Sequence, residues 1–299
     1  MATVSTVASP NITTKPATPP DVVTYRLDLA APLTLFFTVF FLAPLGILIF
    51  VSLHADTQMT RLGLDQYARF LGDPFSLGVL GKTLWLGVEV TALCLALGYP
   101  LAWLHVRSGR WAQTMIIFIT LLPLLTSVVV RTFSWIVILG RQGIVNTALM
   151  TMGLIDTPLR LLYSETGVVV ALAQVQMPLM VLPLITALQR IDTNLADASF
   201  ALGAGHWRTF RKVTLPLSLP GVVAGCLLTY AAAITAFITQ TLVGGGQMLF
   251  MPMYIYQQSS TLNNWPFAAA ISIIFLVAVL AAVSVFNALG RFSKGYAQA

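Results

Sequence analysis

The sequence predicts an all-α membrane protein with six transmembrane helices, on the evidence of its composition, its apolar runs and the positions of its basic residues. Of its 299 residues, 57% are hydrophobic and 9% are charged, and the mean hydropathy is +0.85. A soluble domain usually carries about 25% charged residues. A chain with so few charges cannot cover a water-facing surface, so most of its outer surface must face hydrocarbon.

Six apolar runs are each long enough to cross a hydrocarbon core about 30 Å thick as a helix. They cover residues 29–53, 83–105, 114–139, 167–188, 221–243 and 266–289. Residues 29–290 are therefore expected to form one membrane domain. The Thr- and Pro-rich residues 1–28 are expected to be a flexible cytoplasmic tail, because they lack the core and cleavage site of a signal peptide. Residues 291–299 are expected to be a cytoplasmic C-terminal tail.

The Lys and Arg residues favour an orientation with both termini in the cytoplasm, because cytoplasmic segments carry the excess of basic residues. In that orientation ten of the 16 lie inside: Lys15, Arg26, Arg107, Arg110, Arg190, Arg208, Arg211, Lys212, Arg291 and Lys294. Six lie outside: Arg61, Arg69, Lys82, Arg131, Arg141 and Arg160. They flank apolar runs instead of covering one face, so nucleic-acid binding is not expected.

The inner loop of residues 190–220 is much longer than a connection between neighbouring helices needs to be. Asp192 is one of three consecutive residues that can cap a short helix ending at Leu202. That helix has an apolar stripe of Leu195, Ala198, Ala201 and Leu202. Gly203 and Gly205 are expected to break it and to permit positive φ.

A second short helix is predicted over residues 206–213, and Pro216 and Pro220 are expected to stop it before the fifth span. The residues alone leave two interpretations open. The loop is either an interfacial hairpin whose basic residues only fix the topology, or an element that inserts into a cytosolic partner.

The spacing within this loop resembles that of the ABC-importer permeases. Their pattern is Glu-Ala-Ala, three residues, Gly, nine residues, Ile, one residue, Leu-Pro; here it reads Asp197-Ala198-Ser199, Gly203, Val213 and Leu215-Pro216. The resemblance implies a six-span type I ABC importer permease fold, with a cytoplasmic coupling helix seated in a dimer of ATP-binding subunits that bind the ATP and Mg²⁺. The coupling residues it implies are Asp197, Ala198, Ser199, Leu202, Gly203, Ala204, Leu215 and Pro216.

Residues 98–102, 122–146, 184–192 and 242–246 also resemble the spermidine/putrescine-type branch of these permeases. This resemblance implies a place in a bacterial inner membrane and half of a path for a small polar solute, a polyamine or a related amine or opine-like compound. It further implies an extracytoplasmic solute-binding protein and a second permease subunit that is a different chain.

No feature of the sequence predicts an enzyme or a cofactor in this chain. The phosphate-binding pattern GxxxxGK[ST] is missing, and the three histidines lie in separate loops or span ends. The two cysteines, Cys94 and Cys226, lie inside apolar runs and are expected to be small buried hydrophobes.

Polar residues within the spans are candidates for the solute path: Glu89, Arg131, Trp135, Gln174 and Gln176. A carboxylate in hydrocarbon is costly, so Glu89 either pairs with another span or attracts a cationic solute. Trp135 either binds an amine by cation–π attraction or anchors the chain at the interface. Arg131 would repel a polycation. Gly221 and Gly225 form a GxxxG pattern that suits subunit contact or packing within the chain.

The alternative function is a secondary transporter driven by an ion gradient. Such a protein needs inverted repeats or paired broken helices with buried ion ligands. The sequence predicts neither, and Glu89 is the one acid deep in a span.

Overall fold

The computed structural model describes residues 27–294, so residues 1–26 of the predicted N-terminal tail and residues 295–299 lie outside it. The chain divides into two compact units, Met1–Gly46 and Ile47–Ala299. Most of helix α1 (Leu27–Ser52) belongs to the first unit, and it covers the first predicted span. All regular elements among residues 27–294 are helical, and six apolar helices are long enough to cross a membrane. The predicted all-α membrane fold is confirmed.

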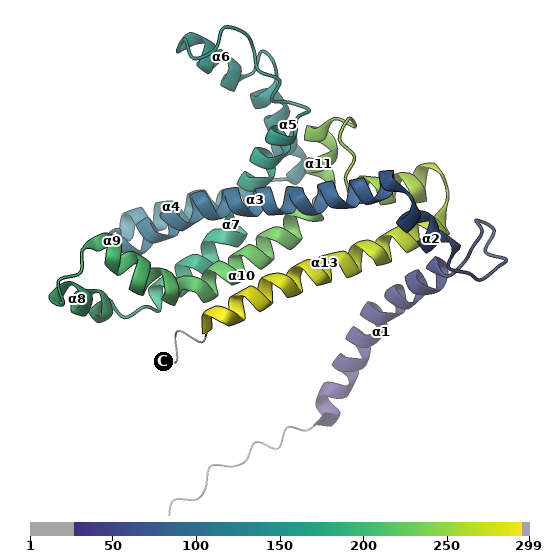
Figure 1. Ribbon diagram of the computed structural model, residues 1–299, viewed down its shortest axis with the longest axis horizontal. Coiled ribbons are helices and arrows are strands. Elements are labelled where there is room, and N and C mark those ends of the chain that lie inside the picture. Colours follow the sequence, from purple (N-terminus) through teal and green to yellow (C-terminus); the bar gives the residue numbers. More distant parts are fainter. Residues whose placement is uncertain (1–26, 295–299) are drawn as a thin grey trace, which may run out of the picture. The chain divides into compact units, whose positions relative to one another are not determined.

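The second unit contains the remaining helices, shown in Figure 1. In chain order they are α2 (Asp65–Gly72), α3 (Pro74–Arg107), α4 (Arg110–Leu125), α5 (Val128–Leu139), α6 (Ile144–Thr151), α7 (Glu165–Gln189), α8 (Thr193–Ala201), α9 (His206–Thr209), η1 (Phe210–Thr214), α10 (Leu215–Ile234), α11 (Phe237–Gly244), α12 (Met251–Tyr256), η2 (Gln257–Thr261) and α13 (Trp265–Lys294). The elements η1 and η2 are π-helical turns.

Helix α3 begins nine residues before the predicted second span. The Gly72-Asp73-Pro74 sequence, which is typical of a turn, caps this helix instead. The Asp73 carboxylate accepts hydrogen bonds from the Phe75 and Ser76 amides at 3.2 and 3.1 Å, and Pro74 occupies the first helical position. A proline costs nothing there because its missing N–H would have no partner in the helix.

The third predicted span, residues 114–139, is two helices and not one. Thr126 is extended (φ −103°, ψ 147°) and Ser127 has polyproline-II angles (φ −58°, ψ 133°), and these two residues separate α4 from α5. The prediction of a continuous helix was wrong because apolar length alone does not show where a helix is interrupted.

The fifth predicted span differs from the prediction at both ends. Pro216 and Pro220 do not stop a preceding helix, since α9, η1 and α10 run on from His206 to Ile234. The Leu215 amide bonds to the Phe210 carbonyl five residues back, and this wider turn makes room for the Pro216 ring. At the other end α10 stops at Ile234, and Ala236 (φ −75°, ψ 76°) forms an inverse γ-turn before α11.

The core of the second unit forms where α3, α7 and α10 pack against one another. In Figure 1, α3, α10 and α13 run side by side. Both cysteines belong to this core as free buried thiols, as predicted, and Cys94 Sγ lies 3.3 Å from the Ala173 carbonyl oxygen. A second cluster joins α10 to α12 and α13 through side chains that include Tyr230, Met251 and Phe267.

The two glycines of the GxxxG pattern bring α10 against α7. A Cβ at Gly221 would lie 2.4 Å from the Ala187 Cβ and 2.8 Å from the Pro183 oxygen. A Cβ at Gly225 would lie 2.9 Å from the Met180 sulfur. Of the two interpretations that the sequence left open, the structure shows packing within the chain.

We predict that Gly221→Ala destabilises the protein, because its Cβ would push against the α7 backbone. Overpacking costs about 1–3 kcal/mol, which corresponds to a fall in Tm of about 2–10 °C for the protein in detergent. The control is Gly81→Ala, in α3, where a Cβ meets nothing within 4 Å. This change should leave Tm unchanged or raise it, since alanine favours helix. Equal Tm values for the two variants would contradict the close packing of α10 on α7.

Candidate coupling surface and solute path

Helix α8 is a short helix closed at both ends by local hydrogen bonds. The Asp192 carboxylate accepts a bond from the Asn194 amide at 2.9 Å, as the predicted cap requires. At the other end the Gly203 amide bonds to the Phe200 oxygen at 2.9 Å, and the Ala204 amide bonds to the Ser199 oxygen at 3.1 Å. These two bonds form a Schellman motif, whose left-handed position is Gly203 with φ of 80°. Only one of the two predicted glycines takes positive φ, because Gly205 (φ −73°) caps α9 in an extended conformation.

The predicted apolar stripe of α8 is exposed. Leu202 is 89% exposed and Leu195 is 46% exposed, and Ala198 and Ala201 are exposed between them. Asp197 is exposed as well. An apolar stripe that is presented outward on a well-capped helix is typical of a surface that contacts another protein.

Two contacts beside the apolar stripe hold α8 against α9. Ser199 Oγ and Thr209 Oγ1 share a hydrogen bond of 2.9 Å, and the Phe200 and His206 rings lie 4.9 Å apart. Leu215 and Pro216 are half-buried in the first turn of α10. The structure therefore separates the predicted coupling residues into two groups. The group on α8 and its turn is exposed except for the half-buried Ser199 and Ala204, and Leu215 and Pro216 form a half-buried pair at the junction of η1 and α10.

The two helix breaks are capped in the same way. Ser127 precedes α5, and Arg131 follows it by four residues. Arg131 donates a guanidinium N–H to the Pro123 carbonyl of α4. Ala236 precedes α11, and Gln240 follows it by four residues. Gln240 donates its side-chain amide N–H to the Ala233 carbonyl at 2.8 Å. Both caps satisfy carbonyls that the break leaves without a helical partner.

Helices α5 and α11 pack against each other and bring several polar groups together. Thr132 Oγ1 lies 3.4 Å from Thr239 Oγ1. Three polar atoms beside the breaks are buried without a hydrogen-bond partner among residues 27–294: Arg131 Nε, Gln240 Oε1 and Thr241 Oγ1. Buried groups of this kind normally bind water or a ligand. Arg131 was predicted, whereas Thr239, Gln240 and Thr241 were missed. Three consecutive polar residues inside an apolar run were the signal.

The structure brings two of the other predicted path residues together. Trp135 Nε1 on α5 donates to Gln174 Oε1 on α7 at 3.3 Å. Gln176 is buried on a different face of α7, which it shares with the core residues Ala173 and Met180. The pair of Trp135 and Gln174 is therefore the part of the predicted path that α5 and α7 form between them.

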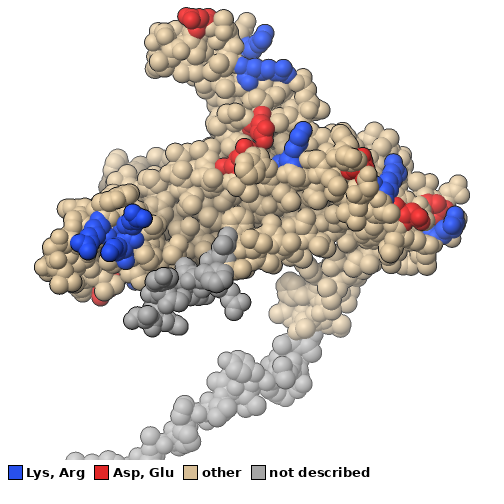
Figure 2. All heavy atoms as spheres, viewed as in Figure 1, with Lys and Arg blue, Asp and Glu red and all other residues tan. Residues whose placement is uncertain are grey.

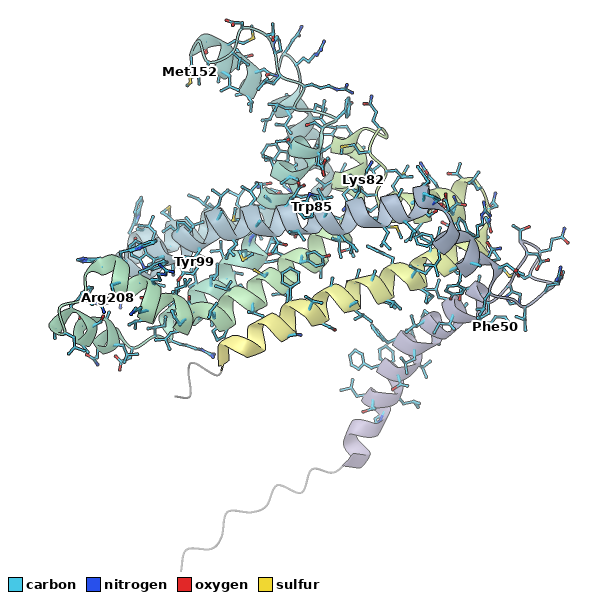
Figure 3. The ribbon with its side chains drawn as sticks, viewed as in Figure 1. Phe50, Lys82, Trp85, Tyr99, Met152 and Arg208 are labelled. Atoms are coloured by element: carbon cyan, nitrogen blue, oxygen red, sulfur yellow. The ribbon has the colours of Figure 1, made fainter. Side chains whose placement is uncertain are left out.

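Glu89 is not joined to that group by any hydrogen bond. Its Oε1 accepts a bond of 2.9 Å from the indole N–H of Trp85, one turn earlier in α3, and its Oε2 has no partner among the described residues. Trp85, marked in Figure 3, is 58% exposed, so Glu89 borders the exposed face of α3.

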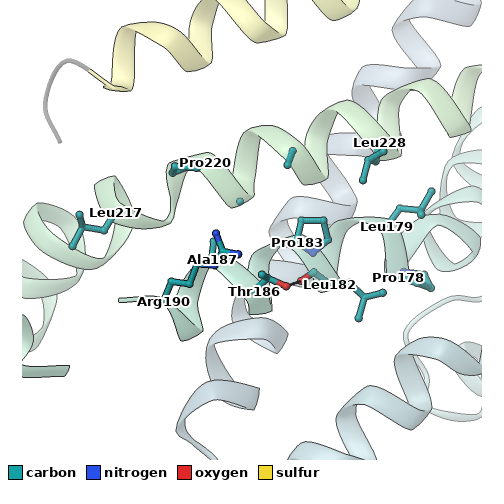
Figure 4. Close-up of a pocket in the computed structure, with 12 residues that line it drawn as sticks. Pro178, Leu179, Leu182, Pro183, Thr186, Ala187, Arg190, Leu217, Pro220 and Leu228 are labelled. Atoms are coloured by element: carbon teal, nitrogen blue, oxygen red, sulfur yellow. Dashed lines mark hydrogen bonds between the residues drawn. The ribbon is translucent and has the colours of Figure 1, made fainter. Parts of the chain in front are cut away.

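A groove of about 610 Å³ lies between α7 and α10 (Figure 4). Pro178 and Pro183 line it from α7, and Pro220 and Gly221 line it from α10. Its walls are apolar except for Thr186 and Arg190. The groove suits apolar contact and does not suit a small polar solute, which needs several hydrogen-bonding partners.

Comparison with known proteins identifies the family. Residues 94–293 match the family described as binding-protein-dependent transport system inner membrane component. The chain belongs to this family. It is 35% identical over 210 residues to the spermidine/putrescine transport system permease protein PotB of Salmonella typhimurium (strain SL1344), covering 70% of this chain and 73% of that one. It is 34% identical over 210 residues to PotB of Escherichia coli (strain K12), covering 70% and 76%.

The fold agrees with this assignment. The chain matches a protein from the bacterial alginate ABC transporter, solved in complex with an alginate pentasaccharide-bound periplasmic protein. The TM-score is 0.72 at 19% identity, and the match covers 90% of this chain and 94% of that one. The chain is thus a permease subunit of an ABC importer and an inner membrane component. Although the structure has two broken helices, which the sequence did not predict, this family membership does not favour the secondary transporter.

We predict that Arg131→Met destabilises the permease, because the Pro123 carbonyl at the break then loses its charged donor and keeps only the Thr126 hydroxyl, at 3.1 Å. A hydrogen bond to a charged group contributes about 1.5–3 kcal/mol, or a difference in Tm of about 3–10 °C. The control is Arg141→Met, which makes the same exchange at an exposed position and should leave Tm unchanged. If the two variants melt together, Arg131 is not the cap of this break.

Proposed function

We propose that α8 is the coupling helix of this permease and docks on a cytosolic ATP-binding subunit. The observation that carries the proposal is the exposed apolar stripe of α8, which runs from Leu195 to Leu202 and ends at the left-handed Gly203. A cytosolic protein with a complementary cleft would bury this stripe and gain the free energy of removing it from water. The match between these residues and the permease spacing pattern supports the same docking surface.

The contacts behind α8 are suited to transmit a motion. The hydrogen bond between Ser199 and Thr209 and the contact between Phe200 and His206 join α8 to α9. Helix α9 then continues through η1 into α10 without a break. In this proposal the partner subunits bind ATP and Mg²⁺, close as a dimer, and draw α8 with them. This chain contributes no step to the hydrolysis.

The complete importer in this proposal has two ATP-binding subunits, a second permease subunit of different sequence and an extracytoplasmic binding protein. Both termini of this chain and α8 lie on the cytoplasmic side. The excess of basic residues on the corresponding segments supports this orientation, and the solved complex of the alginate transporter with a periplasmic protein supports the binding protein.

We infer that the solute is a small amine of the polyamine class. The names of the PotB relatives support this class, and so does the chemistry of the path. The Trp135 ring can bind an ammonium group over its face, and Gln174, Gln240 and Thr241 offer oxygen acceptors. The Arg131 guanidinium, which would repel an amine, is half-buried and bound to a backbone carbonyl.

Glu89 supports the same class of solute. It borders an exposed face of α3, and an ionised carboxylate that faces hydrocarbon is unfavourable. We therefore propose that this face of α3 borders the path between the two permease subunits, where Glu89 attracts cationic solutes.

We predict that Gly203→Asp uncouples ATP hydrolysis from transport. Aspartate tolerates the left-handed conformation, and a Cβ at this position meets nothing within 4 Å, so the turn itself should form. The added carboxylate would face the docked subunit. Stimulation of ATPase activity by the solute-loaded binding protein should fall at least about fivefold in the reconstituted complex.

The control is Gly205→Asp. Gly205 is two residues away, has negative φ and precedes α9 as its cap, a position that aspartate favours. This variant should retain coupling. Normal uptake by a correctly assembled Gly203→Asp complex would remove α8 from the coupling pathway.

We predict that Glu89→Gln lowers kcat/KM for polyamine uptake by about tenfold, because one attractive charge on the path is lost. Glutamine keeps an oxygen that can accept the Trp85 N–H, so the fold is preserved. Glu165→Gln, an exposed change in the first turn of α7, is the control and should leave uptake unchanged. Equal uptake by the two variants and the unaltered importer would exclude Glu89 from the path.

A further inference from the structure

A second pocket, of about 420 Å³, lies between the last turns of α3 and helix α9. It is lined by Tyr99, Pro100, Trp103, His206, Trp207 and Phe210. None of these residues belongs to the coupling surface or to the solute path. Figure 3 marks Tyr99 at this end of α3 and Arg208 on α9.

The walls of this pocket are aromatic and held in place by one another. The Trp207 and Phe210 rings are stacked with centroids 5.6 Å apart, and the Tyr99 ring meets Phe210 edge-on at 5.8 Å. The Tyr99 hydroxyl is fixed by a hydrogen bond of 2.9 Å to Ser218. Trp207 is nevertheless 73% exposed. A large aromatic surface that remains open in a rigid pocket suits an apolar ligand.

The rim of the pocket is cationic. The Arg107 guanidinium carbon lies 4.2 Å from the ring centroid of Trp103, a lining residue. Arg211 is four residues after Trp207 in a continuous helical segment and so lies beside it. Arg107, Arg208 and Arg211 are all exposed. Figure 2 shows Lys and Arg side chains gathered at the end of the second unit that carries α8 and α9.

The spacing of the aromatic and basic residues along α3 fits the boundary between the headgroups and acyl chains of one leaflet. Tyr99 is eight residues before Arg107, so the two lie about 12 Å apart along α3. This places Arg107 at the end of a membrane span and Tyr99 two turns inside it. Tryptophan and tyrosine favour this depth, where one side is apolar and the other is polar.

We propose that this pocket binds one anionic phospholipid, with its phosphate at Arg107 and Arg211 and an acyl chain against Tyr99 and Trp207. The apolar walls fit the chain and the basic rim fits the headgroup. A polyamine does not fit, because the rim repels it. A cytosolic protein does not fit, because the α3 side of the pocket, at Tyr99, lies two turns inside a membrane span. The proposal rests on the proposed orientation only in assigning the lipid to the inner leaflet.

The test is native mass spectrometry of the full chain in neutral detergent, titrated with phosphatidylglycerol or phosphatidylcholine. One phosphatidylglycerol should bind with an affinity that Arg107→Gln/Arg211→Gln lowers about 30-fold. The control is Arg110→Gln/Arg190→Gln, which removes the same charge from exposed positions outside this pocket and should change the affinity less than about threefold. The readout does not depend on the ATP-binding subunit or the solute, so the coupling proposal can fail while this one holds.

Three results would overturn the lipid site: equal losses in the two double variants, equal binding of phosphatidylcholine, or loss of the lipid when the ATP-binding subunit assembles, which would make the pocket a protein interface. A second measurement guards against misfolding. The chain is placed in bilayers of brominated phosphatidylglycerol, which quenches the fluorescence of tryptophans that contact the lipid. The quenched fraction of the tryptophan fluorescence should be smaller for the Trp103→Phe/Trp207→Phe variant than for the unaltered chain. Unchanged quenching in that variant would also contradict the proposal.

Discussion

A backbone carbonyl inside hydrocarbon has no water to bond to, and the structure of the second unit depends on how that requirement is met. At the breaks between α4 and α5 and between α10 and α11, a side chain from the following helix donates to a backbone carbonyl that has no helical amide donor. Arg131 and Gln240 do this from equivalent positions. These caps lower the free-energy cost of the two breaks. The short helices α5 and α11 can therefore bring threonine and glutamine side chains together within the apolar part of the second unit.

Helix α10 connects the two proposed functional regions, the coupling surface and the solute path. Its first turn receives the chain from α9, and its last residue, Ile234, is the point where the fifth span breaks. Between these points α10 approaches α7 closely at Gly221 and Gly225, where an added Cβ would meet α7 atoms. The same α7 carries Gln174, the partner of Trp135. The proposed coupling surface and the proposed solute path are therefore joined by one pair of packed helices.

The sequence predicted the number of spans, the cap at Asp192 and the left-handed Gly203, because each has a local chemical signature. It did not predict the breaks at residues 126–127 and 235–236, which contain neither glycine nor proline and depend on caps four residues further on. It also assigned Pro216 as a helix stop, although a π-turn accommodates the ring. The pairing of Trp135 with Gln174 needs two helices to meet, and no pattern within either helix shows that.

The π-turn joins α9 to α10 without interrupting the helix, and this continuity affects how a motion of α8 and α9 would be passed on. A hinge at that point would absorb a tilt imposed on α8 and α9, but the helical segment from His206 to Ile234 is continuous over 29 residues. Such a segment is about 43 Å long, so a tilt of about 5° at one end displaces the other by about 4 Å. That is more than the radius of a water molecule. In the proposed coupling mechanism, a small rotation of α8 and α9 at the membrane surface would therefore move Ile234, beside the break in the fifth span, by this distance.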